Sequence, residues 1–225
     1  AGLDNMAQLT GSVMEAGAAG VMVAPMPGLN TEAKLKGYFG QVCAALGPDV
    51  PICLQDYPMT VGVHFSVETV IELAIRHPQF VIFKHEDWPG LTKLSRVRAE
   101  SGIGNVPRLS ILTGNAGLFL PLELQRGADG AMTGFAYPEM MVQVVKRHQA
   151  GDVEGAEDLF DAYLPMVRYE QQLGVGLAIR KEILKRRGIL ASAKVRAPGP
   201  KLTATDEIEL TRLMARLEAK LKAFG

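Results

Sequence analysis

The sequence predicts an α/β fold in which parallel strands alternate with helices, followed by a helical extension. Five short apolar runs recur in the first two-thirds of the chain, each followed by a turn rich in glycine or proline. Amphipathic stretches with apolar residues at helical spacing lie between these runs. After about residue 150 only helical patterns remain. These observations predict βα units over residues 1–150 and a helical domain over residues 151–225.

The apolar runs are continuous rather than alternating, which is typical of parallel strands buried on both faces. They cover residues 20–24, 50–54, 80–83, 109–112 and 130–133. The helical stretches between them cover residues 6–16, 32–46, 67–76, 91–99, 118–126 and 139–149. Side chains suited to N-caps precede the helices at Asp4, Thr31 and Ser66, and glycines suited to C-terminal stops follow at Gly17, Gly47, Gly127 and Gly151.

The last third of the chain predicts helices over residues 152–173, 175–187 and 205–224, the last capped by Thr205 or Thr203. Five strands are fewer than the eight of a (β/α)8 barrel, which runs to roughly 250 residues. The chain also begins directly before a helix, at Ala1. The pattern therefore fits either a smaller open sheet or a TIM barrel whose N-terminal βα units are missing from this chain.

Composition argues against several classes of protein. The 225 residues contain 24 lysines and arginines against 24 aspartates and glutamates, so a general electrostatic affinity for nucleic acid or anionic lipid is not expected. No apolar run approaches the roughly 18 residues of a membrane span. Cys43 and Cys53 are far from any CxxC pattern, and the N-terminus does not resemble a signal peptide. We expect a soluble, cytoplasmic protein with no nucleic-acid or membrane partner.

Residues 180–187 form the most basic segment of the chain. This segment is either an anion or nucleic-acid patch, or a solvated helix face whose charges are offset by acids elsewhere. The second is the more common use of such a run.

Lys84 is the most informative single residue, because it ends an otherwise wholly apolar strand. Desolvating an ammonium group is costly, so a lysine in such a place tends to lose its proton. A neutral lysine at the carboxyl end of a parallel strand is a nucleophile that can form a Schiff base with a ketone. The alternative is that Lys84 extends out of the strand end or pairs with Glu86 or Asp87.

Glu86 lies at the same side-chain parity as Lys84 if the extended conformation continues, so that both would face one cavity. A carboxylate there can take a proton from the carbon next to an iminium, or assist a leaving hydroxyl. It can equally be a helix N-terminal carboxylate, stabilised by the helix dipole. His85 would point the other way and serve a structural role.

Other strand ends add candidates, because ligands of α/β sheets bind at the carboxyl ends of the strands. Gln55 and Tyr57, which share parity, close the second strand. The turn Thr113-Gly114-Asn115 follows the fourth strand, where backbone amides can hold a carboxylate, and Thr133 ends the fifth. Motifs for nucleotides, nucleophile elbows or metal ligands are not present in the sequence, so neither a metal nor another cofactor is indicated.

Three segments carry a resemblance to a known family: Val81-Ile82-Phe83-Lys84, Leu112-Thr113-Gly114-Asn115 and Arg126-Gly127-Ala128-Asp129-Gly130. In this order they resemble the Schiff-base lysine strand, the turn that meets the keto-acid carboxylate, and the next strand entry of the dihydrodipicolinate synthase / N-acetylneuraminate lyase family of class I aldolases. Residues 15–23 and 181–198 are similar to further parts of that family. The resemblance implies a (β/α)8 barrel, usually a homotetramer (or a dimer), with a small-molecule 2-keto acid as substrate.

The chain departs from the family pattern in several places. The first three strands of the family and its carboxylate-binding Gly-Thr-Thr-Gly loop have no counterpart in it. Gln55 aligns with the catalytic tyrosine, and Tyr57 would replace that tyrosine only if the loop is rearranged. A second tyrosine of the relay aligns near Met26, and the arginine of dihydrodipicolinate synthases aligns with Thr60, which argues against a role in lysine biosynthesis.

Family members that lack this tyrosine include dehydratases of 2-keto-3-deoxy sugar acids, in which a carboxylate near the lysine can serve as base. The resemblance therefore implies such a dehydratase, with Lys84 as nucleophile and Glu86 as base. Hydroxyl-positioning and pocket-lining roles would fall to Gln55, Tyr57, Thr113, Gly114, Asn115 and Thr133. The alternatives are an aldolase that releases pyruvate through the same imine, and a non-catalytic relative that binds a keto acid.

Overall fold

The computed structural model describes residues 2–223, and the chain divides into two compact units. Unit 1 comprises the chain up to Thr113 together with Gln125–Met132. Unit 2 comprises Gly114–Leu124 and the chain from Thr133 onward. Unit 1 contains the strands and unit 2 is helical. The predicted domains, residues 1–150 and 151–225, stay a prediction beside this division.

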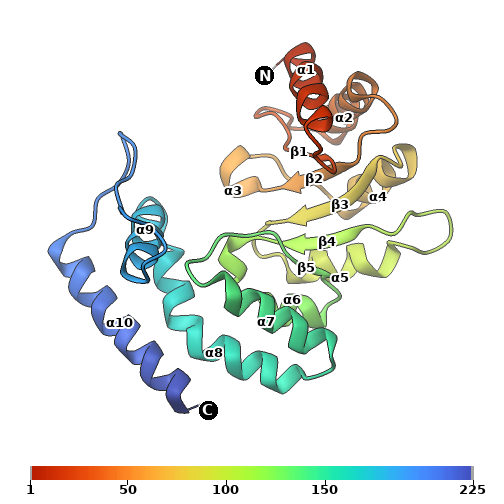
Figure 1. Cartoon of the computed structure of the whole chain (residues 1–225). Helices are drawn as coiled ribbons and strands as arrows, with labels where there is room; N and C mark the ends of the chain where they lie inside the picture. The colour runs from red at the N-terminus through yellow and green to blue at the C-terminus, as the bar shows by residue number, and fades with distance from the viewer. Residues whose placement is uncertain (1, 224–225) are drawn as a thin grey trace. The chain divides into compact units, whose positions relative to one another are not determined.

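Unit 1 is built on a parallel sheet whose strands are neighbours in chain order, as Figure 1 shows. The strands are β1 (Val21–Val23), β2 (Ile52–Asp56), β3 (Phe80–His85), β4 (Ser110–Thr113) and β5 (Gly130–Ala131). All of them overlap the predicted apolar runs, so the predicted α/β class is confirmed. Sequential parallel strands joined through helices are the arrangement of βα units in a barrel.

The helices of unit 1 follow the predicted pattern. They are α1 (Leu3–Glu15), α2 (Glu32–Leu46), α4 (Val67–Arg76) and α5 (Leu91–Glu100), with the unpredicted short helix α3 (Pro58–Val61). The side chains of Thr31 and Ser66 cap α2 and α4, as expected. The prediction for Asp4 is wrong, because α1 begins one residue earlier. Asp4 instead lies in the first turn, where its negative charge interacts favourably with the helix dipole.

The two faces of this sheet differ in character. Residues that pair in register point to the same face, and one such row consists of Val23, Leu54, Phe83 and Ile111. These side chains are at most 5% exposed and pack with residues of α2, α4 and α5 in the hydrophobic core, so we call this side the helix-covered face. The opposite side, which we call the open face, carries the row of Gln55, Lys84 and Leu112.

Unit 2 consists of the turn η1 (Asn115–Gly117) and the helices α6 (Leu120–Gln125), α7 (Pro138–Gln149), α8 (Val153–Glu170), α9 (Gly176–Arg186) and α10 (Ala204–Ala223), of which only Gln125 belongs to unit 1. Helix α8 packs against α7, α9 and α10. Thr203, one of the two predicted caps, accepts a hydrogen bond from the amide of Asp206 at the start of α10. The predicted helix end at Phe224 lies outside the described residues.

Candidate active site

The candidate site lies at the carboxyl ends of β2 and β3, where Gln55 and Lys84 are register partners on the open face. The backbone amide of Glu86 donates to the carbonyl of Asp56 at 2.8 Å, so the parallel hydrogen-bond ladder continues one residue beyond β3. This extended pairing carries the Glu86 side chain to the face of Lys84, as the parity of the sequence predicts.

Three side chains meet at a single carboxylate oxygen. Lys84 Nζ lies 3.1 Å from Glu86 Oε1, and Gln55 Nε2 donates to the same oxygen at 2.8 Å. The Lys84 and Glu86 side chains are only 12% and 8% exposed, so their electrostatic interaction is weakly screened by water. The pairing of Lys84 with Glu86 was one alternative left open by the sequence. It is also the geometry in which a carboxylate can accept the ammonium proton and leave an amine able to attack a carbonyl.

Cys53 lies on the same face, two residues before Gln55 on β2. Burial raises the pKa of its thiol to about 11, and the nearby ammonium group of Lys84 opposes that shift. The thiol is therefore neutral at pH 7. Because a thiolate rather than a thiol is the nucleophile of cysteine chemistry, Cys53 forms a neutral neighbour of Lys84 and not a second nucleophile.

Tyr57 and Thr113 lie apart from this arrangement. Strand β2 ends at Asp56, and Tyr57 has φ −129° and ψ 70° at the start of α3, so the parity that relates it to Gln55 does not extend to it. Thr113 pairs in register with His85, which places its fully buried side chain on the helix-covered face. Roles for both residues in substrate binding stay predictions, and for Thr113 the contribution would come from its backbone.

The other predicted binding residues, Gly114, Asn115 and Thr133, belong to unit 2. Asn115, Ala116 and Gly117 all adopt left-handed conformations, with φ of 51°, 54° and 66°. For residues other than glycine this conformation costs roughly 1–3 kcal/mol each, and such strain concentrates at functional sites. The strain supports the predicted role of this turn as an anion-binding segment.

A second charged cluster was missed by sequence reasoning. It consists of Asp56, His85, Asp87 and Lys93, and we call it the anchor cluster. Lys93 Nζ, from α5, lies 2.6 Å from Asp56 Oδ2 and 3.0 Å from Asp87 Oδ2, and His85 Nδ1 lies 3.4 Å from Asp56 Oδ2. Asp56 and His85 are 0% and 2% exposed on the helix-covered face. The sequence could have indicated the face on which Asp56 and His85 lie. Each follows a core residue of its strand, Leu54 or Phe83, by two positions and so shares its face.

In unit 2, buried charged groups hold the segment that follows β5. Glu170, fully buried, accepts a hydrogen bond from the amide of Ala136 at 2.9 Å and pairs with Arg180 at 2.5 Å. Arg180 also donates to the carbonyl of Gly134 at 2.8 Å, and a Cβ atom at Gly134 would collide with the guanidinium group. Burial raises the pKa of Glu170, although the charge of Arg180 acts in the opposite direction. The path of residues 134–136 is thus fixed by α8 and α9.

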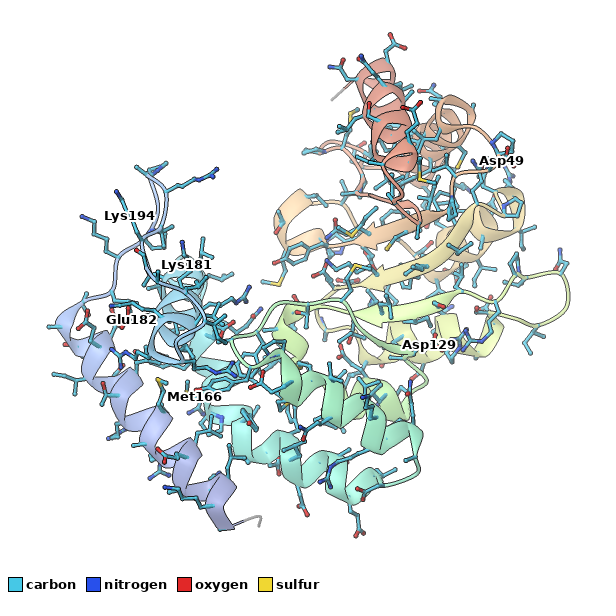
Figure 2. All side chains as sticks on the ribbon, in the orientation of Figure 1. Asp49, Asp129, Met166, Lys181, Glu182 and Lys194 are labelled. Carbon is cyan, nitrogen blue, oxygen red and sulfur yellow. The ribbon has the colours of Figure 1, made fainter. Side chains whose placement is uncertain are left out.

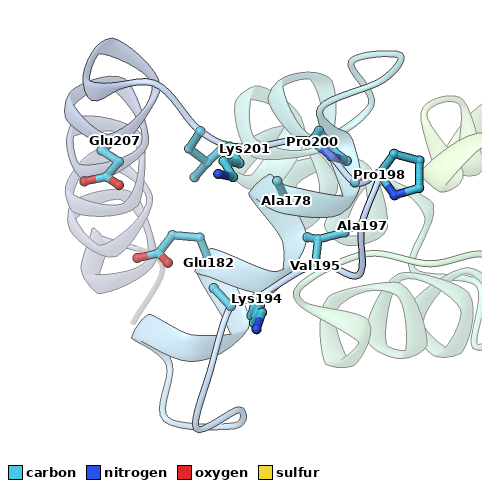
Figure 3. A pocket seen from close by; sticks show the side chains of 12 residues that line it. Ala178, Glu182, Lys194, Val195, Ala197, Pro198, Pro200, Lys201 and Glu207 are labelled. Carbon is cyan, nitrogen blue, oxygen red and sulfur yellow. The ribbon is translucent and has the colours of Figure 1, made fainter.

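The basic segment of residues 180–187 forms much of α9, and Figure 2 shows Lys181 and Glu182 on this helix. Glu182 pairs with Lys185 at 3.5 Å and with Arg186 at 2.8 Å, and Arg187 pairs with Glu139. This internal pairing favours the interpretation as a helix face with offset charges. A cavity of about 410 Å³ lies between α9, the segment that follows it and the start of α10 (Figure 3). Both lysines and glutamates line this cavity.

Within residues 2–223, no group of three or more histidine, cysteine, aspartate or glutamate side chains is arranged to hold a metal ion. None of the helices in this part of the chain is long and apolar enough to span a membrane.

A model of the dihydrodipicolinate synthetase family matches residues 2–220 of the chain. The chain belongs to this family. The resemblance inferred from the sequence is therefore confirmed at the level of the family, whose members are lyases.

Two curated relatives and one solved structure show the range of the similarity. The chain is 27% identical over 187 residues to L-2-keto-3-deoxyarabonate dehydratase of Azospirillum brasilense, a match that covers 83% of this chain and 58% of that protein. It is 28% identical over 169 residues to 4-hydroxy-tetrahydrodipicolinate synthase of Bifidobacterium animalis subsp. lactis, covering 73% and 52%. The crystal structure of a dihydrodipicolinate synthase from Rhodopseudomonas palustris is 48% identical, with a TM-score of 0.92, over 96% of this chain and 71% of that one.

These matches place the sheet of unit 1 in the TIM-barrel fold of the dihydrodipicolinate synthetase family. The chain spans between about half and three fifths of the length of the curated relatives. The presence of further βα units before this chain, one of the two interpretations of the strand count, stays a prediction.

Proposed function

We propose that the protein is a Schiff-base-forming lyase that acts on a 2-keto acid. The observation that carries the proposal is the ion pair of Lys84 with Glu86 at the carboxyl end of a parallel strand, with Gln55 bound to the same carboxylate. Imine formation with a ketone requires an amine next to a group that accepts and returns protons, and this pair supplies both.

The first half of the reaction builds the imine. Lys84 passes a proton to Glu86, 3.1 Å away, and the neutral amine attacks the C2 ketone of the substrate. Glu86 returns that proton to the departing hydroxyl, so that water leaves and an iminium forms. The positively charged nitrogen makes the C3 protons more acidic. Glu86, again a carboxylate, then removes a C3 proton to give an enamine.

The second half decides the product. In a dehydration, the enamine electrons expel the C4 hydroxyl, which leaves as water with the proton that Glu86 carries, and hydrolysis of the imine restores Lys84. We favour dehydration of a 2-keto-3-deoxy sugar acid. Two observations support it. Gln55, the residue that the resemblance places at the position of the family's catalytic tyrosine, donates a hydrogen bond to Glu86, and one relative is named as a dehydratase of this kind.

Two alternatives use the same residues. In a retro-aldol cleavage Glu86 takes the proton of the C4 hydroxyl, the C3–C4 bond breaks, and the products are pyruvate and an aldehyde. A non-catalytic relative would bind a keto acid without turnover. Product analysis separates them, because a dehydratase keeps the carbon chain whole and an aldolase divides it.

Borohydride trapping tests the proposal. The protein is incubated with pyruvate or a 2-keto-3-deoxy sugar acid, reduced with borohydride and analysed by intact mass and peptide mapping. We expect an adduct on Lys84 that is lost in Lys84→Ala and retained in Lys34→Ala, a change at an exposed lysine of α2. No adduct on the unchanged protein, or an adduct that survives Lys84→Ala, overturns the proposal.

Three further expectations belong to this proposal. Tyr57, Gly114, Asn115 and Thr133 would contact the substrate, the protein would act as a homo-oligomer, either tetramer or dimer, and it would be located in the cytoplasm.

A further inference from the structure

We propose that His85 is a positioning residue for the candidate base Glu86, acting from the opposite face of the sheet through the loop of residues 86–90. The inference depends on the proposed function and deepens it, because it states what holds the base against the nucleophile. It assigns to the anchor cluster the task of fixing that loop.

His85 binds the far end of the loop. Its Nε2 lies 2.9 Å from the carbonyl oxygen of Gly90, and since a carbonyl can only accept, Nε2 is the donor. The imidazole is 2% exposed and stacks on Phe83, with ring centroids 5.5 Å apart and an angle of 25° between the planes. A Cβ atom at Gly90 would lie 2.5 Å from His85 Nε2, so the loop backbone is in direct contact with the ring.

Two other contacts hold the start and the middle of the loop. The amide of Glu86 donates to the carbonyl of Asp56 at 2.8 Å, and the carboxylate of Asp87 contacts Lys93 at 3.0 Å. Lys93 in turn contacts Asp56 at 2.6 Å, so the same buried carboxylate connects β2 to α5 and faces His85. The loop is therefore fixed at residues 86, 87 and 90, all through groups on or beside the helix-covered face.

Alternation along β3 makes this arrangement consequential. Lys84 and Glu86 point to the open face, and His85 between them points to the helix-covered face. A change at His85 that releases Gly90 removes the contact at the far end of the loop, so that the backbone carrying the Glu86 carboxylate keeps the contacts at residues 86 and 87 but loses the third. A base displaced by about 1 Å loses on the order of a hundredfold in rate, whereas the nucleophile on the regular strand is not displaced.

The test compares His85→Phe with His85→Gln. Phenylalanine keeps the volume and the stacking but cannot donate to Gly90, whereas the glutamine amide reaches the position of Nε2 and can donate. His148→Phe, on α7 of unit 2, is the matched control. Each protein is trapped with pyruvate and borohydride, assayed for exchange of the C3 protons of pyruvate with deuterium, and examined by acrylamide quenching of Trp88. This residue is the single tryptophan of the chain and lies inside the loop.

We expect His85→Phe to reach the same end-point yield of borohydride adduct when trapping is run to completion, because Lys84 is unchanged. We expect it to exchange C3 protons between about tenfold and a hundredfold more slowly, and to show stronger quenching of Trp88. His85→Gln and His148→Phe should behave as the unchanged protein does. Exchange at the normal rate in His85→Phe overturns the inference, and so does an equal loss of adduct and exchange in both His85 variants.

The two proposals fail in different ways. If the unchanged protein forms no adduct, the proposed function is wrong and the inference is wrong with it. If the adduct forms and His85→Phe exchanges normally, only the inference is wrong. If His85→Phe does not fold, Gly90→Ala takes its place, because the added methyl group displaces the same contact from the loop side, and the same selective loss of exchange is expected.

Discussion

Two lysine–carboxylate pairs lie on opposite faces of the same region of the sheet. On the open face Lys84 contacts Glu86 at 3.1 Å, with side chains 12% and 8% exposed. On the helix-covered face Lys93 contacts Asp56 at 2.6 Å, with side chains 11% and 0% exposed. Burial alone therefore does not distinguish the pair that we assign to chemistry from the pair that we assign to structure.

The partners around each pair make the distinction. Lys93 contacts a second carboxylate, that of Asp87, and Asp56 also faces His85, so this pair joins two strands, a loop and a helix. The carboxylate of Glu86 is shared by Lys84 and by the neutral amide of Gln55, all on the open face. Ion pairs with several buried partners fix structure, whereas a lysine beside one carboxylate at a strand end can exchange its proton with that group.

Replacement of Lys84 gives the largest expected effect. Lys84→Arg keeps a positive charge beside Glu86, but a guanidinium remains protonated and cannot form an imine. We expect turnover to fall at least about a thousandfold, equivalent to roughly 4 kcal/mol, with the melting temperature changed little. Steady-state kinetics and circular dichroism measure the two quantities. Substantial turnover in this variant would remove Lys84 from the chemistry.

Replacement of Lys93 should show the opposite division. Lys93→Met leaves the carboxylates of Asp56 and Asp87 in the cluster without their ammonium partner. Loss of one member of a buried ion pair costs about 3 kcal/mol or more, so the free energy of unfolding in urea should fall by that amount. Lys93→Arg, which restores the charge, should cost less. If Lys93→Met is as stable as the unchanged protein, the anchor cluster does not stabilise the fold.

The same two pairs show how far the sequence determines the site. The neighbourhood of Lys84 and Glu86 is predictable, because side chains two residues apart on an extended strand share a face whatever surrounds them. The pairing of Asp56 with Lys93 is not, because it joins residues 37 positions apart and depends on where α5 packs. Thr113 shows the same limit, since its face follows from the register of β4 against β3 and not from its place at a strand end.

The fold follows a similar division. The strands and most helices are predictable, because continuous apolar runs and the caps Thr31 and Ser66 are local signals. The helix expected from residue 118 begins at Leu120. The left-handed residues 115–117 before it could not be predicted, because hydrophobic periodicity does not report backbone handedness. Helix α3 has only four residues, too few for a helical period to be visible.

Gly90→Ala tests whether the two faces are coupled. A Cβ atom at this position would lie 2.5 Å from both His85 Nε2 and the carbonyl oxygen of Asp87, so the loop must shift. We expect turnover to fall between about tenfold and a hundredfold, with KM changed less than kcat. Gly37→Ala is the matched control, because Gly37 is exposed on α2 with open space around it, and alanine there should raise helix stability by roughly 0.5–1 kcal/mol. Equal kinetics in the two variants would mean that the anchor cluster does not act on the site.

Asp129 carries a carboxylate at the amino end of the strands, away from the candidate site. Its replacement gives the smallest expected effect. It lies just before β5, where Figure 2 labels it. Its carboxylate accepts from the amide of Ile111 at 2.8 Å, contacts Arg98 at 3.1 Å and also pairs with Arg108. Burial alone would raise the pKa of Asp129, but Arg108, the Ile111 amide and Arg98 together outweigh burial and lower it.

The pKa of Asp129 is lower in the folded chain than its ordinary value of 3.8 in the unfolded chain. The carboxylate therefore stabilises the fold at pH values above 3.8, and this contribution is lost as the pH falls through the folded pKa. Asp129→Asn should therefore reduce the free energy of unfolding by roughly 1 kcal/mol at pH 7, a figure kept small because the Asp129 and Arg108 side chains are 28% and 58% exposed. The difference between the two proteins should shrink below about pH 4, and kcat should not change. Urea unfolding across that range measures the first effect and steady-state kinetics the second. A lower kcat with unchanged stability would place chemistry at the amino ends of the strands and contradict the assignment of the site to their carboxyl ends.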